Sequence, residues 1–149
     1  MHYDVIILGA GASGLFCAFT AAQRGRRVLV LERANKVGKK ILMSGGGRCN
    51  FTNYSIEPNN FISSNCHFCK ASLKRYSQWD FLSLVERYDI AFEERQYGQL
   101  FCLNSARDIL NMLLTECENA GVDIRTNCQV SDVKAVEGAE DEGARFKLS

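Results

Sequence analysis

The chain has 149 residues, of which 46% are hydrophobic and 23% charged, so its composition excludes wholesale disorder and suits one globular domain. Eighteen basic and seventeen acidic side chains give a net charge of +1, which predicts no whole-chain attraction to nucleic acid or to an anionic membrane. Seven cysteines, an odd number with no signal peptide before them, favour reduced thiols and a cytoplasmic location.

An uncharged run at residues 5–22 is long enough to raise the question of a membrane span. Asp4 precedes the run, and no basic segment typical of a secretory signal stands before it. Three glycines and Ser13 also divide the run into pieces of different periodicity. We therefore expect no membrane partner.

The first elements of the chain predict a βαβ unit. Residues 3–8 form a short apolar run, typical of a strand buried on both faces. Small and apolar residues at 12–24 predict a helix ended by Gly25, and residues 28–32 predict a second buried strand. A strand, a glycine turn, a helix and a strand within about thirty residues predict a parallel sheet in a Rossmann-like α/β fold.

The middle of the chain is less regular. Residues 33–53 contain few apolar positions and predict a long loop with one helical turn. Residues 66–88 predict a helix broken near Ser77, and residues 92–101 predict two short strands around a glycine.

Ser105 and Asp108 match a capping box that opens a long amphipathic helix, and Gly121 stands where a helix ends. Two further strands are predicted at residues 122–126 and 129–136. An acidic turn follows at 138–143, and a return strand starts at 145–148. The last of these would begin a β-meander.

A glycine motif occupies the junction of the first strand and helix, with the sequence Gly9-Ala10-Gly11-Ala12-Ser13-Gly14. Gly9 permits a tight turn, Gly11 lets the backbone approach a pyrophosphate, and Gly14 lets the helix pack close to the strand. The backbone N–H groups at the helix start then hold phosphates. Glu32, at the end of the next strand, stands where an acid that binds a ribose is expected.

The same unit limits the choice of dinucleotide. Glu32 suits two ribose hydroxyls and would repel a 2′-phosphate, which disfavours NADP, although the neighbouring Arg33 acts in the opposite direction. The βαβ unit by itself does not separate FAD from NAD, so both cofactors stay open at this point.

A second glycine motif lies in the predicted loop. Three successive glycines, Gly45–Gly47, give a backbone that can lie against a flat or anionic ligand, and Arg48 can reach a phosphate or a carboxylate. Cys49 is interpreted as a structural residue or a cofactor contact rather than a nucleophile. A mobile surface loop without a ligand is the alternative interpretation.

Two other groups of residues receive a structural interpretation. Cys66 and Cys69 form a C-x-x-C pair, but zinc requires four ligands and no second pair of suitable spacing exists, so no metal site is predicted. Trp79, with Tyr76 and Phe81, is interpreted as core rather than as a base-stacking platform, because the charge of the chain is near neutral.

On residues 4–15, 32–33 and above all 38–53, the sequence resembles the HI0933-like, or aminoacetone-oxidase-like, family of bacterial NAD(P)/FAD-dependent oxidoreductases. The resemblance implies that the first βαβ unit binds FAD, that the second glycine motif lies near the phosphates and the flavin, and that the backbone of Val130 meets the adenine. The implied cofactor-binding residues are Gly9, Gly11, Ala12, Ser13, Gly14, Glu32, Arg33, Lys40, Ser44, Gly45, Gly46, Gly47, Arg48 and Val130.

Chains of that family are more than twice as long as this one. We therefore expect residues 1–149 to be an incomplete N-terminal FAD-binding domain of an FAD-dependent, NAD(P)H-linked oxidoreductase. Its substrate would be an unidentified small molecule, with no nucleic-acid partner, and an open sheet edge would favour self-association. The alternatives are a catalytically inert fragment that binds FAD or ADP, an NAD-dependent dehydrogenase domain, and a tRNA-modifying flavoprotein, which would need basic patches.

Overall fold

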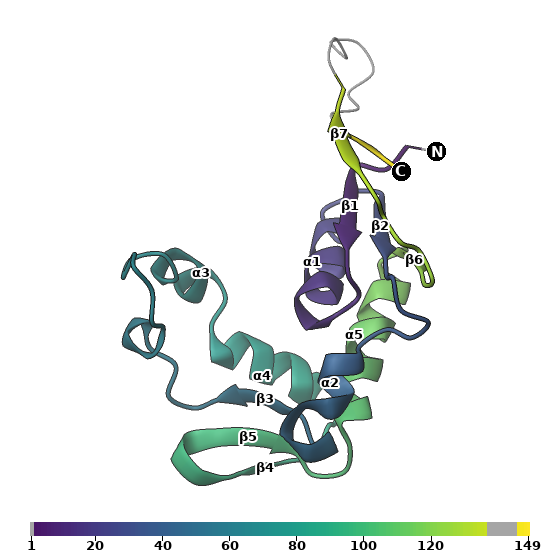
Figure 1. The fold of residues 1–149 in the computed structure, drawn as a ribbon. Helices are drawn as coiled ribbons and strands as arrows, with labels where there is room; N and C mark the ends of the chain where they lie inside the picture. The colour runs from purple at the N-terminus through teal and green to yellow at the C-terminus, as the bar shows by residue number, and fades with distance from the viewer. Residues whose placement is uncertain (1, 137–145) are drawn as a thin grey trace. The chain divides into compact units, whose positions relative to one another are not determined.

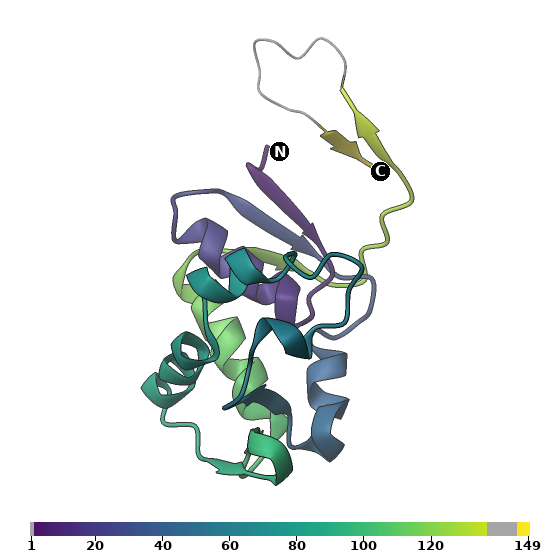
Figure 2. The same ribbon diagram turned by 90° about the vertical axis from the view of Figure 1, so that its left-hand side faces the viewer.

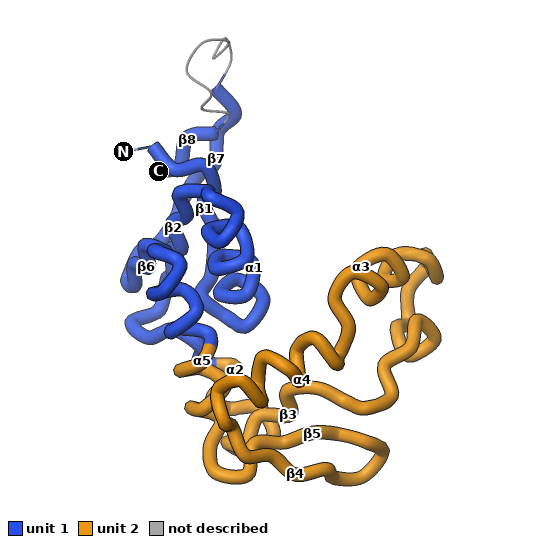
Figure 3. Tube along the Cα trace, turned by 180° about the vertical axis from the view of Figure 1, so that it is seen from behind, with its two compact units in different colours: residues 1–39, 113–149 blue, residues 40–112 orange. Residues whose placement is uncertain are grey.

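The computed structural model describes residues 2–136 and 146–149 (Figure 1). The chain divides into two compact units (Figure 3): unit 1 is Met1–Lys39 with Leu113–Ser149, and unit 2 is Lys40–Met112. Each unit has its own sheet and its own buried side chains. Within the described ranges, no helix is long and apolar enough to cross a membrane.

Unit 1 is built on a three-stranded parallel sheet of order β1-β2-β6, with strands at Val5–Leu8, Val28–Leu31 and Asp123–Arg125. Helix α1 (Ala12–Ala22) connects β1 to β2, as the sequence predicts for a βαβ unit. The α/β class and the parallel sheet are therefore confirmed.

Apolar packing against α1 fixes this unit. Leu15 and Ala18 of α1 are fully buried, and so is Val30 of the central strand β2. Helix α5 (Ala106–Asn119) reaches α1 at its C-terminal end, where the Cys117 thiol donates to the Leu15 carbonyl over 3.4 Å.

Strand β1 departs from the expected burial on both faces, because Leu8 is 54% exposed. Helix α1 packs against β1 and β2, and both strands also border an open groove of about 1490 Å³. Residues of β7 (Val133–Ala135) and β8 (Phe146–Leu148) also line the groove. The prediction of burial on both faces holds for β2 alone.

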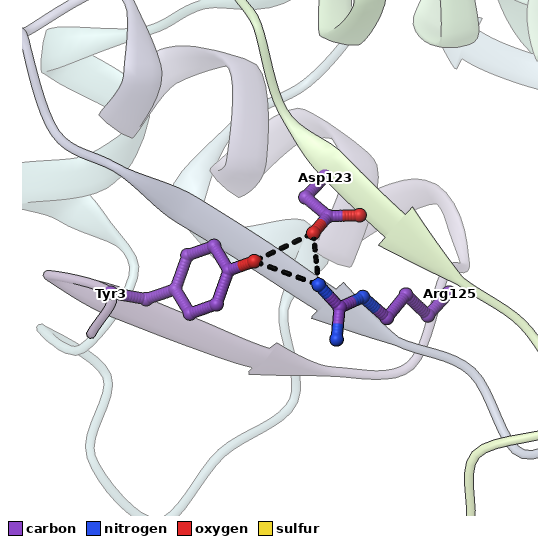
Figure 4. A network of polar contacts seen from close by, with 3 residues as sticks. All are labelled: Tyr3, Asp123 and Arg125. Carbon is purple, nitrogen blue, oxygen red and sulfur yellow. Dashed lines mark hydrogen bonds and ion pairs between the residues drawn. The ribbon is translucent and has the colours of Figure 1, made fainter. Parts of the chain in front are cut away.

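A surface network ties the beginning of the chain to β6 (Figure 4). The Tyr3 hydroxyl donates to Oδ2 of Asp123 over 2.6 Å and accepts from Nη2 of Arg125 over 2.9 Å. Arg125 and Asp123 also form an ion pair of 2.6 Å. All three side chains are at least partly exposed to solvent, so water and salt screen the charges of this network.

Strands β7 and β8 pair antiparallel, which confirms the start of a β-meander. The predicted strand at 129–136 begins only at Val133, so Val130 lies in the preceding irregular segment and does not open a strand. The expected acidic turn at 138–143 lies outside the described residues.

Unit 2 contains an antiparallel sheet of order β3-β5-β4, with strands at Asn50–Asn53, Gln99–Cys102 and Phe92–Glu94. Helix α2 (Lys39–Met43) begins at the boundary between the units and is followed by a 3₁₀ turn, Ser44–Gly47. Helix α2 confirms the single helical turn expected within the loop over 33–53, whereas strand β3, at the end of the same range, was not predicted.

The helical region of unit 2 is broken where the sequence predicts. Helix α3 (Lys70–Arg75) and helix α4 (Gln78–Arg87) flank Ser77, which caps α4 in a reciprocal pair of hydrogen bonds with Asp80. Residues 66–69 form turns rather than helix. Short 3₁₀ turns at Pro58–Asn60 and Gln96–Gly98 complete the unit.

Candidate functional site

The turn between β1 and α1 brings the first glycine motif together at the start of a helix. The N–H of Gly9 donates to the Leu31 carbonyl over 2.8 Å, and its φ of +102° favours glycine. A Cβ on Gly14 would lie 2.0 Å from the Gly9 carbonyl oxygen, so this close approach of helix and strand requires glycine. The sequence-based roles of these two residues in the turn agree with this geometry.

Gly11 has a different environment. It is the N-cap of α1, so it offers no side chain to the first-turn N–H groups, and the first turn carries no acidic residue. A Cβ on Gly11 would meet no atom within 4 Å. The neighbouring Ala12 and Ser13 are exposed. The positive end of the helix dipole therefore faces open space, which suits an anion.

Glu32 follows β2 directly and spans two backbone segments. Its Oε2 accepts from the N–H of Ala10 and its Oε1 accepts from the N–H of Ala34, each over 2.8 Å. The N–H of Ala34 and then that of Ala10 hold the pKa of the Glu32 carboxyl below its ordinary value, and the nearby positive charges of Lys39 and Arg33 act in the same direction. Glu32 is therefore an ionised carboxylate at neutral pH.

This double hydrogen bond is a feature that the sequence does not reveal. The Glu32 carboxylate lies at the end of β2 and also holds the glycine turn, because it accepts from the N–H of Ala10, which belongs to that turn. A carboxylate offers about four acceptor positions, so roughly two remain for hydroxyl groups of a ligand. Turn and carboxylate together suit a phosphate and a ribose, the parts of a dinucleotide.

The second glycine motif lies in unit 2 and has a left-handed backbone, with φ of +56° at Gly45, +65° at Gly46 and +83° at Gly47. A Cβ on Gly45 would lie 2.7 Å from the Phe101 ring, so this glycine is required by packing. A Cβ on Gly46 would meet nothing within 4 Å. The fold therefore has space for a side chain at Gly46 but not at Gly45.

Arg48 is held by hydrogen bonds to residues at the end of β5. Its guanidinium donates to the Leu103 carbonyl, and its carbonyl accepts from the N–H of Cys102 over 2.8 Å. Cys49 is buried, and this burial raises the pKa of its thiol, so the thiol is not activated as a nucleophile. The interpretation of Cys49 as structural is consistent with this position.

The expected site residues divide between the two units. Unit 1 holds those of the first βαβ unit together with Arg33, which is exposed, and Val130, which is half-buried and stands far along the chain. Unit 2 holds Lys40, exposed on α2, and the residues of the second glycine motif. Among the residues that the structure describes, no group of three or more His, Cys, Asp or Glu side chains is placed to hold a metal ion.

Two curated proteins share most of this sequence. The Ribosomal RNA dihydrouridine synthase of Escherichia coli (strain K12) is 53% identical over 132 residues, which are 89% of this chain and 33% of the relative. The Ribosomal RNA dihydrouridine synthase of Haemophilus influenzae is 48% identical over 147 residues, which are 99% of this chain and 36% of the relative. The chain thus spans about a third of the length of these curated relatives.

Solved structures share the fold at much lower identity. The 3-ketosteroid-delta4-(5alpha)-dehydrogenase from Rhodococcus jostii RHA1, in complex with 4-androstene-3,17-dione, matches with a TM-score of 0.59 and 15% identity. The match covers 89% of this chain and 39% of that chain. At this identity the likeness concerns the fold alone.

The names of the two relatives correct two expectations. The expected enzyme class, an NAD(P)H-linked oxidoreductase, is wrong, because the relatives are named as synthases of dihydrouridine. The expectation of no nucleic-acid partner is wrong as well, because both names specify ribosomal RNA. The net charge of +1 was a poor guide, since a sum over the whole chain conceals segments of one sign.

The family resemblance inferred from the glycine motifs is confirmed. A sequence model of the HI0933-like protein Rossmann domain matches residues 3–147, which include both motifs and nearly the whole chain. The chain therefore belongs to the HI0933-like family, whose Rossmann domain it carries.

Proposed function

We propose that this chain is the FAD-binding portion of an enzyme that reduces uridine to dihydrouridine in ribosomal RNA. The observation that carries the proposal is the exposed glycine turn at the N-terminus of α1, with the Glu32 carboxylate hydrogen bonded to it. The reaction is suggested by the name shared by the two curated relatives. The chain spans about a third of the length of those relatives, so the activity of the whole enzyme is part of this proposal.

Unit 1 would bind the adenosine diphosphate half of FAD. The first-turn N–H groups that follow Gly11 would donate to the pyrophosphate, in the open space beside that residue. The remaining acceptor positions of Glu32 would bind the ribose hydroxyls. We assign the backbone of Val130 to the adenine on the family resemblance, and Arg33 to the edge of the same half.

Lys40 and the segment 44–48 of unit 2 form a second set of proposed cofactor contacts, supported by the exposed and open position of Gly46. Arg48 would contribute further N–H donors, because a guanidinium has five and the Leu103 carbonyl occupies only part of them. FAD titration of a Gly46→Ala variant tests these contacts of unit 2 separately from those of unit 1.

Reduced FAD, when bound, supplies the hydride that saturates the C5–C6 bond of uracil together with a proton. The role assigned to this chain is to bind and orient the dinucleotide. No side chain of this chain is assigned to the proton transfer.

Calorimetric titration of the 149-residue chain with FAD, ADP and NAD tests the proposal. We expect FAD and ADP to bind with comparable affinity, because the proposed contacts of unit 1 involve the adenosine diphosphate half. Gly11→Val should abolish both while leaving Tm nearly unchanged, since the added side chain meets no protein atom near its Cβ. A folded chain that binds neither FAD nor ADP contradicts the proposal, and a preference for NAD would favour a dehydrogenase domain instead.

A further inference from the structure

One segment of unit 2 is basic and aromatic without any acidic residue. From Pro58 to Trp79 the sequence contains no Asp or Glu, whereas Lys70, Lys74 and Arg75 lie on the exposed surface of α3. Within the part of the chain that the structure describes, none of these three cations forms an ion pair. Their charges are therefore available to an external anion.

Trp79, which follows this helix on α4, is not a core residue. Its side chain is 52% exposed, which corrects the expectation of burial, although it stacks on Tyr54 with ring centroids 5.6 Å apart and an interplanar angle of 25°. A hydrogen bond also holds the backbone of Tyr54 against the start of α4, because the side-chain amide of Gln78 donates to the Tyr54 carbonyl over 3.2 Å. An aromatic surface is thus held open to solvent.

Tyr97, in the turn between β4 and β5, carries a second exposed ring. Its side chain is 88% exposed and its φ is +60°, a strained conformation for a residue with a Cβ. The amide of Asn53 donates to the Tyr97 carbonyl over 2.8 Å, and the N–H of Tyr54 donates to the Gly98 carbonyl over 2.9 Å. The turn that presents Tyr97 is therefore tied to the segment that carries the stack.

These features lie in α3, the start of α4, the end of β3 and the turn between β4 and β5, on the side of unit 2 that Figure 2 turns toward the viewer. We propose that they form an RNA-binding surface, made of Tyr54, Trp79, Tyr97, Lys70, Lys74 and Arg75, that binds single-stranded nucleotides of the substrate. Exposed aromatic rings stack on unpaired bases, and neighbouring cations follow the phosphates.

The single-stranded form is favoured because a paired base keeps both faces within the helical stack. An enzyme that acts on the uracil ring also needs its target base outside the stack, and neighbouring nucleotides must then be held elsewhere. The inference rests on the proposed function, since ribosomal RNA enters through the names of the relatives. It goes beyond that function in assigning the RNA contacts to particular residues.

Trp79 is the only tryptophan of the chain, so its fluorescence reports on this surface directly. The probe is a fluorescein-labelled single-stranded RNA of about 12 nucleotides, within the usual site size, titrated in the absence of FAD. We expect the RNA to quench Trp79 and to gain anisotropy, and a duplex of equal length to bind more weakly. Polyglutamate serves as a competing anion without bases.

Variants separate stacking from charge. Trp79→Ala and Tyr97→Ala should each weaken binding by about 5- to 150-fold, the effect of losing one base–aromatic stack. Lys74→Ala combined with Arg75→Ala should lower the slope of log affinity against log salt by about 1.4, at about 0.7 for each phosphate contact in a single strand. Phe146→Ala and Arg24→Ala, exposed residues of unit 1, are matched controls that should bind as the unchanged chain does.

Circular dichroism and Tm establish that each variant is folded. The proposal is overturned if RNA leaves Trp79 fluorescence unchanged, if the folded Tyr97 variant binds as tightly as the unchanged chain, or if polyglutamate quenches Trp79 as well as RNA does. Loss of FAD binding with intact RNA binding would count against the proposed function alone. FAD binding without any RNA signal would count against this RNA-binding surface alone.

Discussion

The Glu32→Ala variant separates the two roles that the structure gives to this carboxylate. Glu32 accepts hydrogen bonds from the N–H groups of Ala10 and Ala34, and it also retains acceptor positions for a ribose. Removing the side chain should therefore weaken both folding and FAD binding. A ribose contact alone would predict an effect on binding and none on folding.

The expected magnitudes follow from the two bonds. Ala10 is 0% exposed, so its N–H loses its partner without gaining water, whereas Ala34 is partly accessible and is rehydrated. The unpaired buried donor of Ala10 costs about 1–3 kcal/mol and the lost bond to Ala34 about 1 kcal/mol, so we expect a total loss of about 2–4 kcal/mol of unfolding free energy. For a chain of this size Tm should fall by roughly 4–16 °C. FAD affinity should fall by roughly 10- to 150-fold.

The pH dependence provides an independent check. Because the pKa of Glu32 is lowered in the folded chain, its contribution to stability is present above the ordinary carboxyl value of 4.5 and is lost as pH falls through the folded pKa. The difference in Tm between the unchanged chain and Glu32→Ala should therefore be largest at pH 7 and shrink below pH 4.5. Thermal denaturation at several pH values measures this difference.

Two variants sharpen the interpretation. Glu32→Gln keeps one oxygen that can accept from a backbone N–H, but its NH₂ group would face the other N–H, donor against donor. Its Tm should therefore lie between the Tm of the unchanged chain and that of Glu32→Ala. Arg33→Ala changes an exposed neighbour and should leave Tm within about 1 °C of the unchanged value. Equal Tm and equal FAD affinity of Glu32→Ala and the unchanged chain at pH 7 would refute the reasoning.

Two glycine pairs provide further predictions. Gly14→Ala should destabilise the chain by more than about 3 kcal/mol, since its Cβ would lie 2.0 Å from a backbone oxygen, whereas Gly11→Ala should change Tm by no more than a few degrees. Equal melting of the two variants would contradict the described turn. Gly45→Ala and Gly46→Ala share a positive φ, so both carry backbone strain, but only Gly45→Ala also meets an aromatic ring at 2.7 Å. Denaturant unfolding should show the larger loss for Gly45→Ala, and FAD titration should show that the folded Gly46→Ala variant binds more weakly.

The βαβ unit was predictable because its determinants are local. The apolar run of β2 and the glycine pattern between β1 and α1 each specify their own conformation. The break between α3 and α4 was predictable for the same reason, since Ser77 and Asp80 form their capping pair within one turn. Neither prediction required knowledge of a distant part of the chain.

Elements defined by distant partners were missed. Strand β3 has the sequence Asn-Phe-Thr-Asn, and asparagine is depleted in strands, so its propensity favours a loop. It is a strand because Thr52 pairs with Leu100 and Asn53 pairs with Gln99, nearly fifty residues later in the chain. The partners of Glu32 were hidden likewise, because the Ala10 bond joins residues separated by 22 positions.

The interpretation of Trp79 as core shows how an average can mislead. The net charge of +1 argued against contact with a polyanion and thus for burial of the aromatic residues. Electrostatic attraction at a surface is felt over about 8–10 Å at physiological salt, so the charge of a segment decides it and the charge of the chain does not. The segment from Pro58 to Trp79 contains no acidic residue and carries three exposed cations on α3, and the carboxylates that balance the charge of the chain lie outside this segment. The net charge of the chain therefore gives no sign of a surface for a polyanion. The charge of this segment, compared with the positions of the aromatic residues, favours one.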